Sequence, residues 1–360
     1  MKINEREFNI FEGKRPKVLL LGNGINRAYG GTSWDGLLDS IKDNESYPLS
    51  AYQYCMPMPF KAAMLTNNSL ASKMREIVKD ASDAKIAESK ATINWSSFIN
   101  TNPQMCNQIK RIVQGFDYVL TTNYSYEIEI ALSGAESFTP RQIARLMHCH
   151  EVSAPQTKFL INTFNLVNKT PVWHIHGEAR KPDSMIIGSA YYGKLLRRCV
   201  ERIDGAVTTD SNKKETKSNR IPHGKAIEFK RNFKKLIPQK IGSWVDAFVL
   251  GDVYIIGLGM DFSESELWWL MDLKSSDKEL YGKTVFLDPE IIDRNVCAVD
   301  YRQPCGHSSS FSKERQCRNL MLKNTYSVDV DNLGITITNN EDYLRFYESA
   351  AEHFNHELSK

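Results

Sequence analysis

Six short apolar runs set the strongest constraint on the fold of this 360-residue chain. Each has the length of a buried strand, and most lead directly into glycine or a small polar residue. Strands of a parallel sheet are covered on both faces and therefore read as continuous apolar segments. The predicted strands are residues 17–21, 117–122, 172–175, 184–187, 253–256 and 284–287. The sequence thus predicts an open, mostly parallel α/β sheet whose functional loops gather at the carboxyl ends of the strands.

Helical patterns occupy much of the remaining sequence. Residues from about 36 to 115 are mostly helical in pattern, most clearly at 71–81 and 108–114, and Ser33 is the predicted N-cap at their start. Another helix is expected from about Ser263. We expect one large domain over residues 1–300, with 36–115 as a helical insertion or small subdomain, and a C-terminal extension at 301–360 that packs on the core or on a partner.

Composition excludes several classes of protein. An apolar share of 41% is ample for a buried core, so wholesale disorder is excluded. A net charge of +3 does not by itself indicate a nucleic-acid or membrane partner. No apolar run approaches the roughly 20 residues of a membrane span, and the N-terminus lacks a signal-peptide pattern. We therefore expect a cytoplasmic protein whose seven cysteines, none in a C-x-x-C pair, are reduced thiols.

One stretch departs from this balanced charge. Residues 206–236 hold nine basic and three acidic side chains, a local net charge of +6. Two interpretations remain open: a solvated loop that leads into an amphipathic helix, or a basic surface for a partner. Any nucleic-acid contact is expected only indirectly, through this surface.

Two strand–helix loops are rich in glycine. The first is Gly22-Asn23-Gly24-Ile25-Asn26, and the second is Gly257-Leu258-Gly259. Phosphate binding requires a backbone free of obstructing side chains and exposed N–H groups near a helix start, and Gly22 and Gly24 meet the first condition. An ordinary strand–helix turn would also explain the first loop. Two such loops in one parallel sheet fit a dinucleotide better than a mononucleotide.

Polar side chains follow two other predicted strands. Asn123 comes directly after residues 117–122, where its amide can hold a ribose hydroxyl or a water molecule, or cap a turn. His174 and His176 lie at the end of residues 172–175, and strand alternation predicts that they share a face. His176 abuts the loop and can act as a base near neutral pH, whereas His174 is interpreted as a hydrogen-bonded core histidine.

In this order, the motifs G-N-G-I-N, T-T-N-Y, H-I-H-G-E and I-I-G-L-G resemble the sirtuin superfamily, in particular the prokaryotic sirtuin-like proteins that act in anti-phage defence. Further similarity lies at residues 29–34, 188–192 and 263–270. Together these blocks span roughly residues 17–290. The resemblance implies a Rossmann-like fold and NAD⁺ as the substrate, cleaved to nicotinamide and ADP-ribose.

The resemblance also implies roles for matching residues. Asn123 would contact the nicotinamide ribose, and His176 would be the general base there. Gly22, Gly24 and Ile25 would line the pyrophosphate loop, Gly257 and Leu258 would border the adenosine ribose, and Asp288 is a candidate for the adenosine end. The complete set expected to contact NAD⁺ comprises Gly22, Asn23, Gly24, Ile25, Asn26, Thr122, Tyr124, Ser125, Gly257, Leu258, Gly259 and Asp288.

The sequence departs from the family pattern in two ways. Ser125 stands where sirtuins usually have Asp, and no four-cysteine zinc module is present, so no metal is expected. Because that module supports the acyl-peptide cleft, its absence favours simple hydrolysis over deacylation. An NAD⁺- or ADP-ribose-binding module without turnover, and a protein deacylase, remain alternatives. Defence hydrolases must be switched, so we expect a homo-oligomer or a partner protein, such as a ring-forming ATPase.

Overall fold

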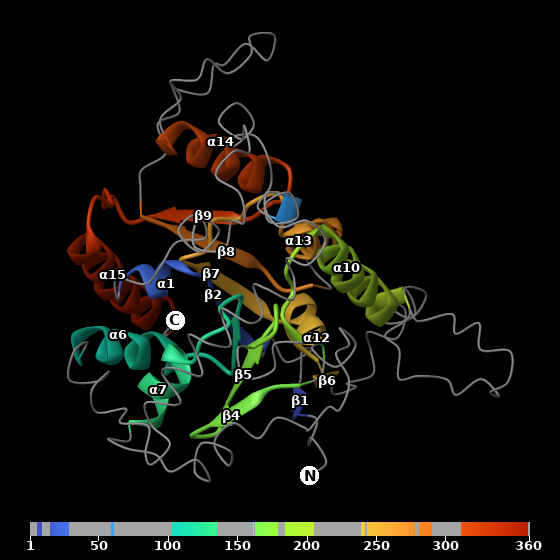
Figure 1. Ribbon diagram of the computed structural model, residues 1–360, viewed down its shortest axis with the longest axis horizontal. Helices are drawn as coiled ribbons and strands as arrows, with labels where there is room; N and C mark the ends of the chain where they lie inside the picture. Colours follow the sequence, from blue (N-terminus) through green and yellow to red (C-terminus); the bar gives the residue numbers. More distant parts are fainter. Residues whose placement is uncertain are drawn as a thin grey trace, which may run out of the picture.

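The computed structural model describes residues 6–8, 15–28, 59–60, 103–134, 161, 163–178, 184–204, 239–241, 243–277, 281–289 and 311–358. Its centre is a seven-stranded sheet with helices on both faces, which confirms the predicted α/β, Rossmann-like class (Figure 1). Every neighbouring pair of strands in it is parallel except β4 and β5. The strands in spatial order are β4 (Asn165–Val167), β5 (Thr170–His174), β3 (Tyr118–Thr121), β2 (Lys17–Leu21), β7 (Asp252–Ile256), β8 (Thr284–Asp288) and β9 (Asp329–Asn332).

The order of the strands reverses beside β2. From β2 the chain proceeds to β3 and β5 on one side, and it then returns to β7, β8 and β9 on the other. Open α/β sheets bind ligands at such a reversal, in the crevice outside the carboxyl ends of the strands. The two glycine loops follow β2 and β7, so both begin at this point.

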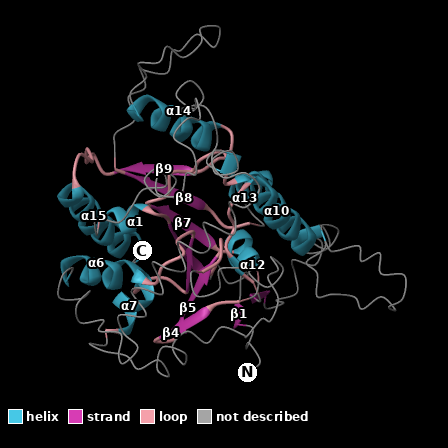
Figure 2. Cartoon of the chain, viewed as in Figure 1, coloured by secondary structure: helices cyan, strands magenta, loops and turns pink. Residues whose placement is uncertain are grey.

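Two helical layers enclose the sheet (Figure 2). One layer contains α6 (Pro103–Val113), α7 (Glu127–Ser133) and α15 (Asn340–Leu358). The other contains α10 (Ser189–Asp204), α12 (Trp244–Leu250) and α13 (Ser265–Ser276), with α14 (Phe311–Asn324) near β9. The short helix α1 (Gly24–Arg27) follows β2, and β1 (Arg6–Phe8) pairs with β6 (Gln239–Ile241) as a separate antiparallel ribbon.

Strand alternation divides the core between these layers. In β2, Leu19 and Leu21 join the apolar cluster under α6 and α15, whereas Val18 and Leu20 join the cluster under α12 and α13. All four side chains are buried, since both faces of the strand are covered. This explains why the sequence shows a continuous apolar run rather than alternation.

Five of the six predicted strands are confirmed as β2, β3, β5, β7 and β8, but the strand predicted at residues 184–187 is wrong. The backbone N–H of Ile186 donates to the carbonyl oxygen of His176 at 2.8 Å, and the Tyr124 hydroxyl donates to the Ile186 carbonyl oxygen at 2.9 Å. The segment is an irregular loop, although Met185, Ile186 and Ile187 are buried. The apolar side chains of this segment indicate burial, and a loop can bury them without the ladder of hydrogen bonds that a strand forms.

Other predicted elements are confirmed only in part. The helix expected from about Ser263 is α13, and α6 accounts for most of residues 108–114. Ser33, residues 71–81 and the basic stretch 206–236 lie outside the described residues. Of the predicted extension at 301–360, the described residues 311–358 supply β9 and α15, which extend the sheet and cover one of its faces. Among the described helices, none has the length and apolar composition that crossing a bilayer requires.

Candidate functional site

The two predicted glycine loops contact each other directly. The backbone N–H of Gly24 donates to the carbonyl oxygen of Gly257 at 2.7 Å, and that of Gly22 donates to Ile256 at 3.0 Å. A Cβ atom on Gly22 would lie 2.4 Å from the Gly257 carbonyl oxygen, so only glycine fits there. These two N–H groups are therefore used inside the protein, and the glycines serve close packing of the loops rather than presenting free donors at these positions.

Asn123 is held against the first glycine loop. Its side-chain Nδ2 donates to the Gly22 carbonyl oxygen at 3.1 Å, and its backbone N–H donates to Thr121 Oγ1 at 3.1 Å. The side chain of Asn123 is buried. Because Nδ2 is engaged, the amide orientation is fixed and Oδ1 is the atom left to accept a hydrogen bond.

Residues flanking Asn123 connect the loops further. The Asn26 amide Nδ2 donates to Ser125 Oγ at 3.3 Å and to Asn23 Oδ1 at 3.2 Å. Asn26 Oδ1 is buried and has no hydrogen-bond partner among the described residues. The backbone N–H of Thr122 donates to Leu21, next to Gly22. Asn26 thus links the first glycine loop to Ser125 and leaves one unsatisfied amide oxygen there, which suits a polar ligand.

His174 and His176 do not share a face, contrary to the prediction from alternation. β5 ends at His174, and the following turn carries the chain away from strand geometry. His174 contacts Glu129 of α7 in one layer, whereas His176 contacts Glu266 of α13 in the other. Alternation applies only while the backbone stays extended, so it fails across the end of a strand.

His174 is the buried, hydrogen-bonded core histidine that the sequence indicates. Its Nδ1 lies 2.6 Å from the carbonyl oxygen of Asn123, and its Nε2 lies 2.7 Å from Glu129 Oε1. Burial lowers the pKa of His174, but the Glu129 charge and hydrogen bond, the Glu178 charge and the Asn123 carbonyl outweigh it and raise the pKa to about 9. Because both ring nitrogens face acceptors, His174 is an imidazolium that donates twice and fixes the Asn123 backbone.

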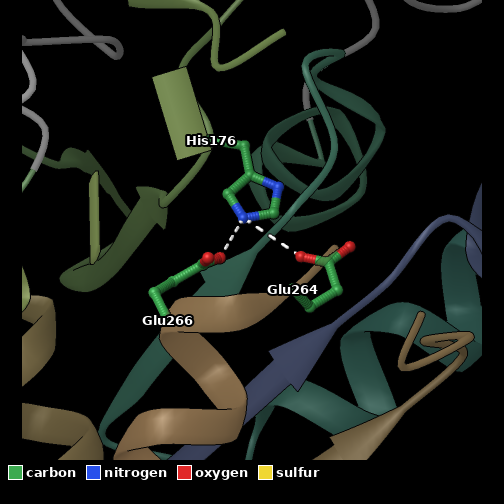
Figure 3. A group of neighbouring side chains, drawn as sticks. All are labelled: His176, Glu264 and Glu266. Carbon is green, nitrogen blue, oxygen red and sulfur yellow. Dashed lines mark hydrogen bonds and ion pairs between the residues drawn. The ribbon is translucent and has the colours of Figure 1, made fainter. Parts of the chain in front are cut away.

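His176 points its Nε2 at two carboxylates of the segment that begins α13 (Figure 3). Nε2 lies 2.6 Å from Glu266 Oε1 and 3.3 Å from Glu264 Oε2. Burial lowers the pKa of His176, but the charges of Glu264 and Glu266 reverse this and leave it raised. Burial raises the pKa of Glu264 to about 8, against the opposing charge of His176.

The turn that carries His176 requires glycine at the next position. Gly177 has a φ of +91°, and a Cβ atom there would lie 2.2 Å from the Ser184 carbonyl oxygen. Tyr192 of α10 packs edge-on against the imidazole, with ring centroids 5.2 Å apart. The ring is therefore fixed by packing on one side and by carboxylates on the other.

The Asn123 loop and the His176 cluster share a neighbourhood through Tyr124. Burial raises the pKa of Tyr124, and the nearby charges of Glu264 and Glu266 raise it further. Asn123 and His176, both described residues, do not hydrogen-bond to each other. Each is anchored separately, Asn123 to Gly22 and His176 to α13.

The predicted adenosine residues form a third group. Asp288 ends β8 and is buried, and its Oδ2 accepts from Arg318 at 2.5 Å and from Asn319 at 3.0 Å. Arg318 also donates to the Gly259 carbonyl oxygen at 2.5 Å. Asp288 and the second glycine loop are thus joined through an arginine of α14, so the Asp288 carboxylate already has a cationic partner.

Sequence reasoning missed the acidic side chains that hold the two histidines. Glu129 lies in α7, and Glu264 and Glu266 lie at the start of α13. An available signal was the pair of glutamates two residues apart after a glycine loop, at Ser263-Glu264-Ser265-Glu266. Within the described residues, His176, Glu264 and Glu266 also form a group whose ligand atoms lie within 4.8 Å of one another, a set that can hold a metal ion.

One known family matches part of the chain. Residues 117–216 match the model of the SIR2-like domain, a segment that contains Asn123, His174 and His176. No curated protein sequence matches the chain. The family match supports a relationship to the sirtuin-like superfamily and an NAD-related activity, because SIR2-like domains bind NAD⁺.

Proposed function

We propose that the chain is an NAD⁺ glycohydrolase that cleaves the bond between nicotinamide and ribose. One observation carries the proposal: Asn123 and His176 each lie two residues beyond the adjacent parallel strands β3 and β5, and Asn123 is hydrogen-bonded to Gly22, where the two glycine loops meet. This is the edge of the sheet, next to the reversal of strand order, at which α/β proteins bind nucleotides. The SIR2-like match over both residues supports the same choice of ligand.

Asn123 is proposed to orient the ribose and the attacking water. Its Nδ2 donates to Gly22, so its Oδ1 can accept from a ribose hydroxyl or from water. His174 holds the backbone carbonyl oxygen of the same residue. A residue held through both its side chain and its backbone loses little entropy when the substrate binds, which favours a reactive arrangement.

His176 is proposed to accept the proton of that water at Nδ1. Glu266 Oε1 lies 2.6 Å from Nε2 and is the stronger of the two carboxylate contacts. If Nε2 carries the hydrogen that Glu266 accepts, the neutral ring keeps its lone pair on Nδ1. Nδ1 has no hydrogen bond to a described residue, so it is the nitrogen available for the reaction.

The proposed reaction balances with water as the only co-reactant. The bond from ribose C1′ to the pyridinium nitrogen breaks, and its electron pair stays with nicotinamide, which leaves as a neutral molecule. The water oxygen bonds to C1′, and the water proton passes to His176 Nδ1 and then to solvent. The products are nicotinamide, ADP-ribose and one proton. General-base assistance of this kind contributes typically about 10²- to 10⁴-fold in rate.

The test is incubation of the full chain with NAD⁺ at several protein concentrations, with products separated by chromatography. We expect nicotinamide and ADP-ribose from the wild type, and loss of both with Asn123→Ala and with His176→Ala. Glu201→Gln is the matched control, because within the described residues Glu201 forms its ion pairs with Arg197 and Arg198 of its own helix, α10. Full activity in either site variant would remove that residue from the mechanism.

Two other outcomes correspond to the alternatives. Binding of NAD⁺ or ADP-ribose without products, measured by calorimetry, would favour a regulatory binding module. Asn123 and His176 are both buried, so a substrate must open the site to reach them. This burial is the observation that keeps the binding module as an alternative. Nicotinamide release that depends on an added acylated peptide would favour a protein deacylase.

We further propose that hydrolysis depletes cellular NAD⁺ as an anti-phage, abortive-infection response. Such an activity must be switched, and self-assembly or a partner protein such as a ring-forming ATPase is the proposed switch. Turnover per molecule that rises with protein concentration would support self-assembly. No turnover at any protein concentration, followed by turnover when a partner is co-expressed, would support a partner protein as the switch.

A further inference from the structure

His176, Glu264 and Glu266 together offer one imidazole nitrogen and two carboxylate oxygens to a single point (Figure 3). His176 is 1% exposed and Glu266 is 0% exposed. Glu266 uses Oε1 for His176, while its Oε2 is buried and has no hydrogen-bond partner among the described residues. A buried carboxylate oxygen without a partner is costly, and a ligand in the cluster would satisfy it.

The charges around this point are unbalanced. Glu264 and Glu266 bring two carboxyl groups to the imidazole of one histidine, His176. Within the described part of the chain, His176 is the only positively chargeable group in ion-pair contact with Glu264 and Glu266. Buried carboxyl groups are normally paired with cations or coordinate metals, so the cluster has the composition of a cation site.

The spacing suits one ion after a small movement. Zn–N and Zn–O bonds of about 2.0–2.2 Å place ligand atoms of one tetrahedral ion roughly 3.3–3.6 Å apart. Glu264 Oε2 already lies 3.3 Å from His176 Nε2. Glu266 Oε1 lies 2.6 Å from Nε2, a hydrogen-bond distance, so this pair must open by several tenths of an ångström.

We propose that His176, Glu264 and Glu266 form a site for one divalent transition-metal ion such as Zn²⁺, and that the bound ion inhibits the enzyme. The mixed nitrogen and oxygen ligands favour a borderline ion over Mg²⁺ or Ca²⁺, which prefer oxygen alone. The ion takes the lone pair of Nε2, so the single hydrogen of the neutral ring must lie on Nδ1. Nδ1 then cannot accept a proton from water. The inhibitory half rests on the proposed function, whereas the metal site does not.

Co²⁺ added to the purified full chain tests the site independently of NAD⁺. We expect saturable visible d–d absorbance without the near-ultraviolet thiolate band that cysteine ligation would add. Glu264→Gln and Glu266→Gln should each weaken this signal at least about ten-fold, while Glu201→Gln leaves it unchanged. Circular dichroism and thermal unfolding establish that each variant is folded. A thiolate band, or equal Co²⁺ affinity in all variants, would overturn the site.

Zn²⁺ added to the NAD⁺ assay tests the inhibition. Wild-type turnover should fall as Zn²⁺ saturates the site and return when a chelator is added, and Mg²⁺ should have no such effect. Glu264→Gln should need at least about ten-fold more Zn²⁺ for the same fractional loss. Zn²⁺ bound without inhibition in an active enzyme would overturn the inhibitory role. Expected Co²⁺ binding in a protein that never hydrolyses NAD⁺ would leave the site intact and reject the proposed function.

Discussion

His174 Nδ1 lies 2.6 Å from the backbone carbonyl oxygen of Asn123, while Nε2 of the same ring lies 2.7 Å from Glu129. A carbonyl oxygen and an ionised carboxylate can only accept hydrogen bonds, so the ring must donate from both nitrogens. The core histidine is therefore a buried cation that joins α7 to the loop after β3. It contacts Asn123 through the backbone carbonyl oxygen and not through the side chain.

This relationship predicts a loss of stability at alkaline pH. The pKa of His174 is about 9 in the folded protein, above the ordinary value of 6.5 in an unfolded chain. Its contribution is therefore complete below about pH 6.5 and is lost as the pH rises through about 9, for a total of roughly 3 kcal/mol. Urea unfolding at several pH values should show this decline in the wild type. The decline should be absent, or much smaller, in His174→Gln, and an equal decline in both proteins would contradict the assignment.

The contact between the glycine loops predicts that Gly22→Ala is disruptive. The added Cβ would lie 2.4 Å from both Gly257 O and Leu258 Cα, which are backbone atoms that cannot move aside cheaply. We expect a loss of about 1–3 kcal/mol or more in the free energy of unfolding, together with weaker NAD⁺ binding. Gly193→Ala is the matched control, because a Cβ there meets nothing within 4 Å in the middle of α10.

The control should move in the opposite direction. Alanine is favoured over glycine inside a helix, so Gly193→Ala should stabilise the protein by roughly 0.5–1 kcal/mol. Thermal and urea unfolding of both variants measure the difference. Equal stability of Gly22→Ala and the wild type would show that the loops separate more easily than their contact indicates.

The contact between Glu266 and His176 Nε2 predicts that a substitution of Glu266 affects turnover more than substrate binding. Glu266→Gln should lower kcat by roughly 10- to 100-fold with little change in KM, because the neutral amide can still accept a hydrogen bond but lacks the negative charge that stabilises the protonated ring. Glu266→Asp should restore part of kcat, since it keeps the charge. Steady-state kinetics of the three proteins, after removal of metals, separate this role from a purely structural one. Equal changes in kcat for the Gln and Asp variants would argue against orientation by charge.

The hydroxyl of Tyr347 predicts a contrast between two substitutions in α15. This side chain is fully buried, and its hydroxyl has no hydrogen-bond partner among the described residues. Tyr347→Phe removes an unsatisfied group and should leave the free energy of unfolding unchanged or slightly higher. Tyr347→Ala leaves a cavity and should cost about 3–5 kcal/mol. Urea unfolding of both variants measures these changes. A large loss of stability in Tyr347→Phe would show that the hydroxyl has a hydrogen-bond partner.

Much of the sheet could be predicted because its signals are local. β2, β7 and β8 are continuous apolar runs, and both glycine loops follow such runs directly. β9, with sequence Asp329-Val330-Asp331-Asn332, could not be recognised in this way. It is an edge strand of polar residues, and its pairing with β8 depends on where the chain returns after α14. The strand wrongly predicted at residues 184–187 has a related cause. Its apolar side chains are buried in a loop, and the sequence of a buried loop can resemble that of a buried strand.

The sequence by itself determined which segments enter the sheet and which side chains stand at the carboxyl ends of its strands, because strand length, burial and glycine turns are encoded within a few neighbouring residues. Only the tertiary structure decided that the two histidines of His174-Ile175-His176 diverge, one toward Glu129 and the other toward Glu266. Those glutamates are 45 and 90 residues away along the chain. Partners so distant are chosen by the packing of α7 and α13 on opposite faces of the sheet, which no local pattern records.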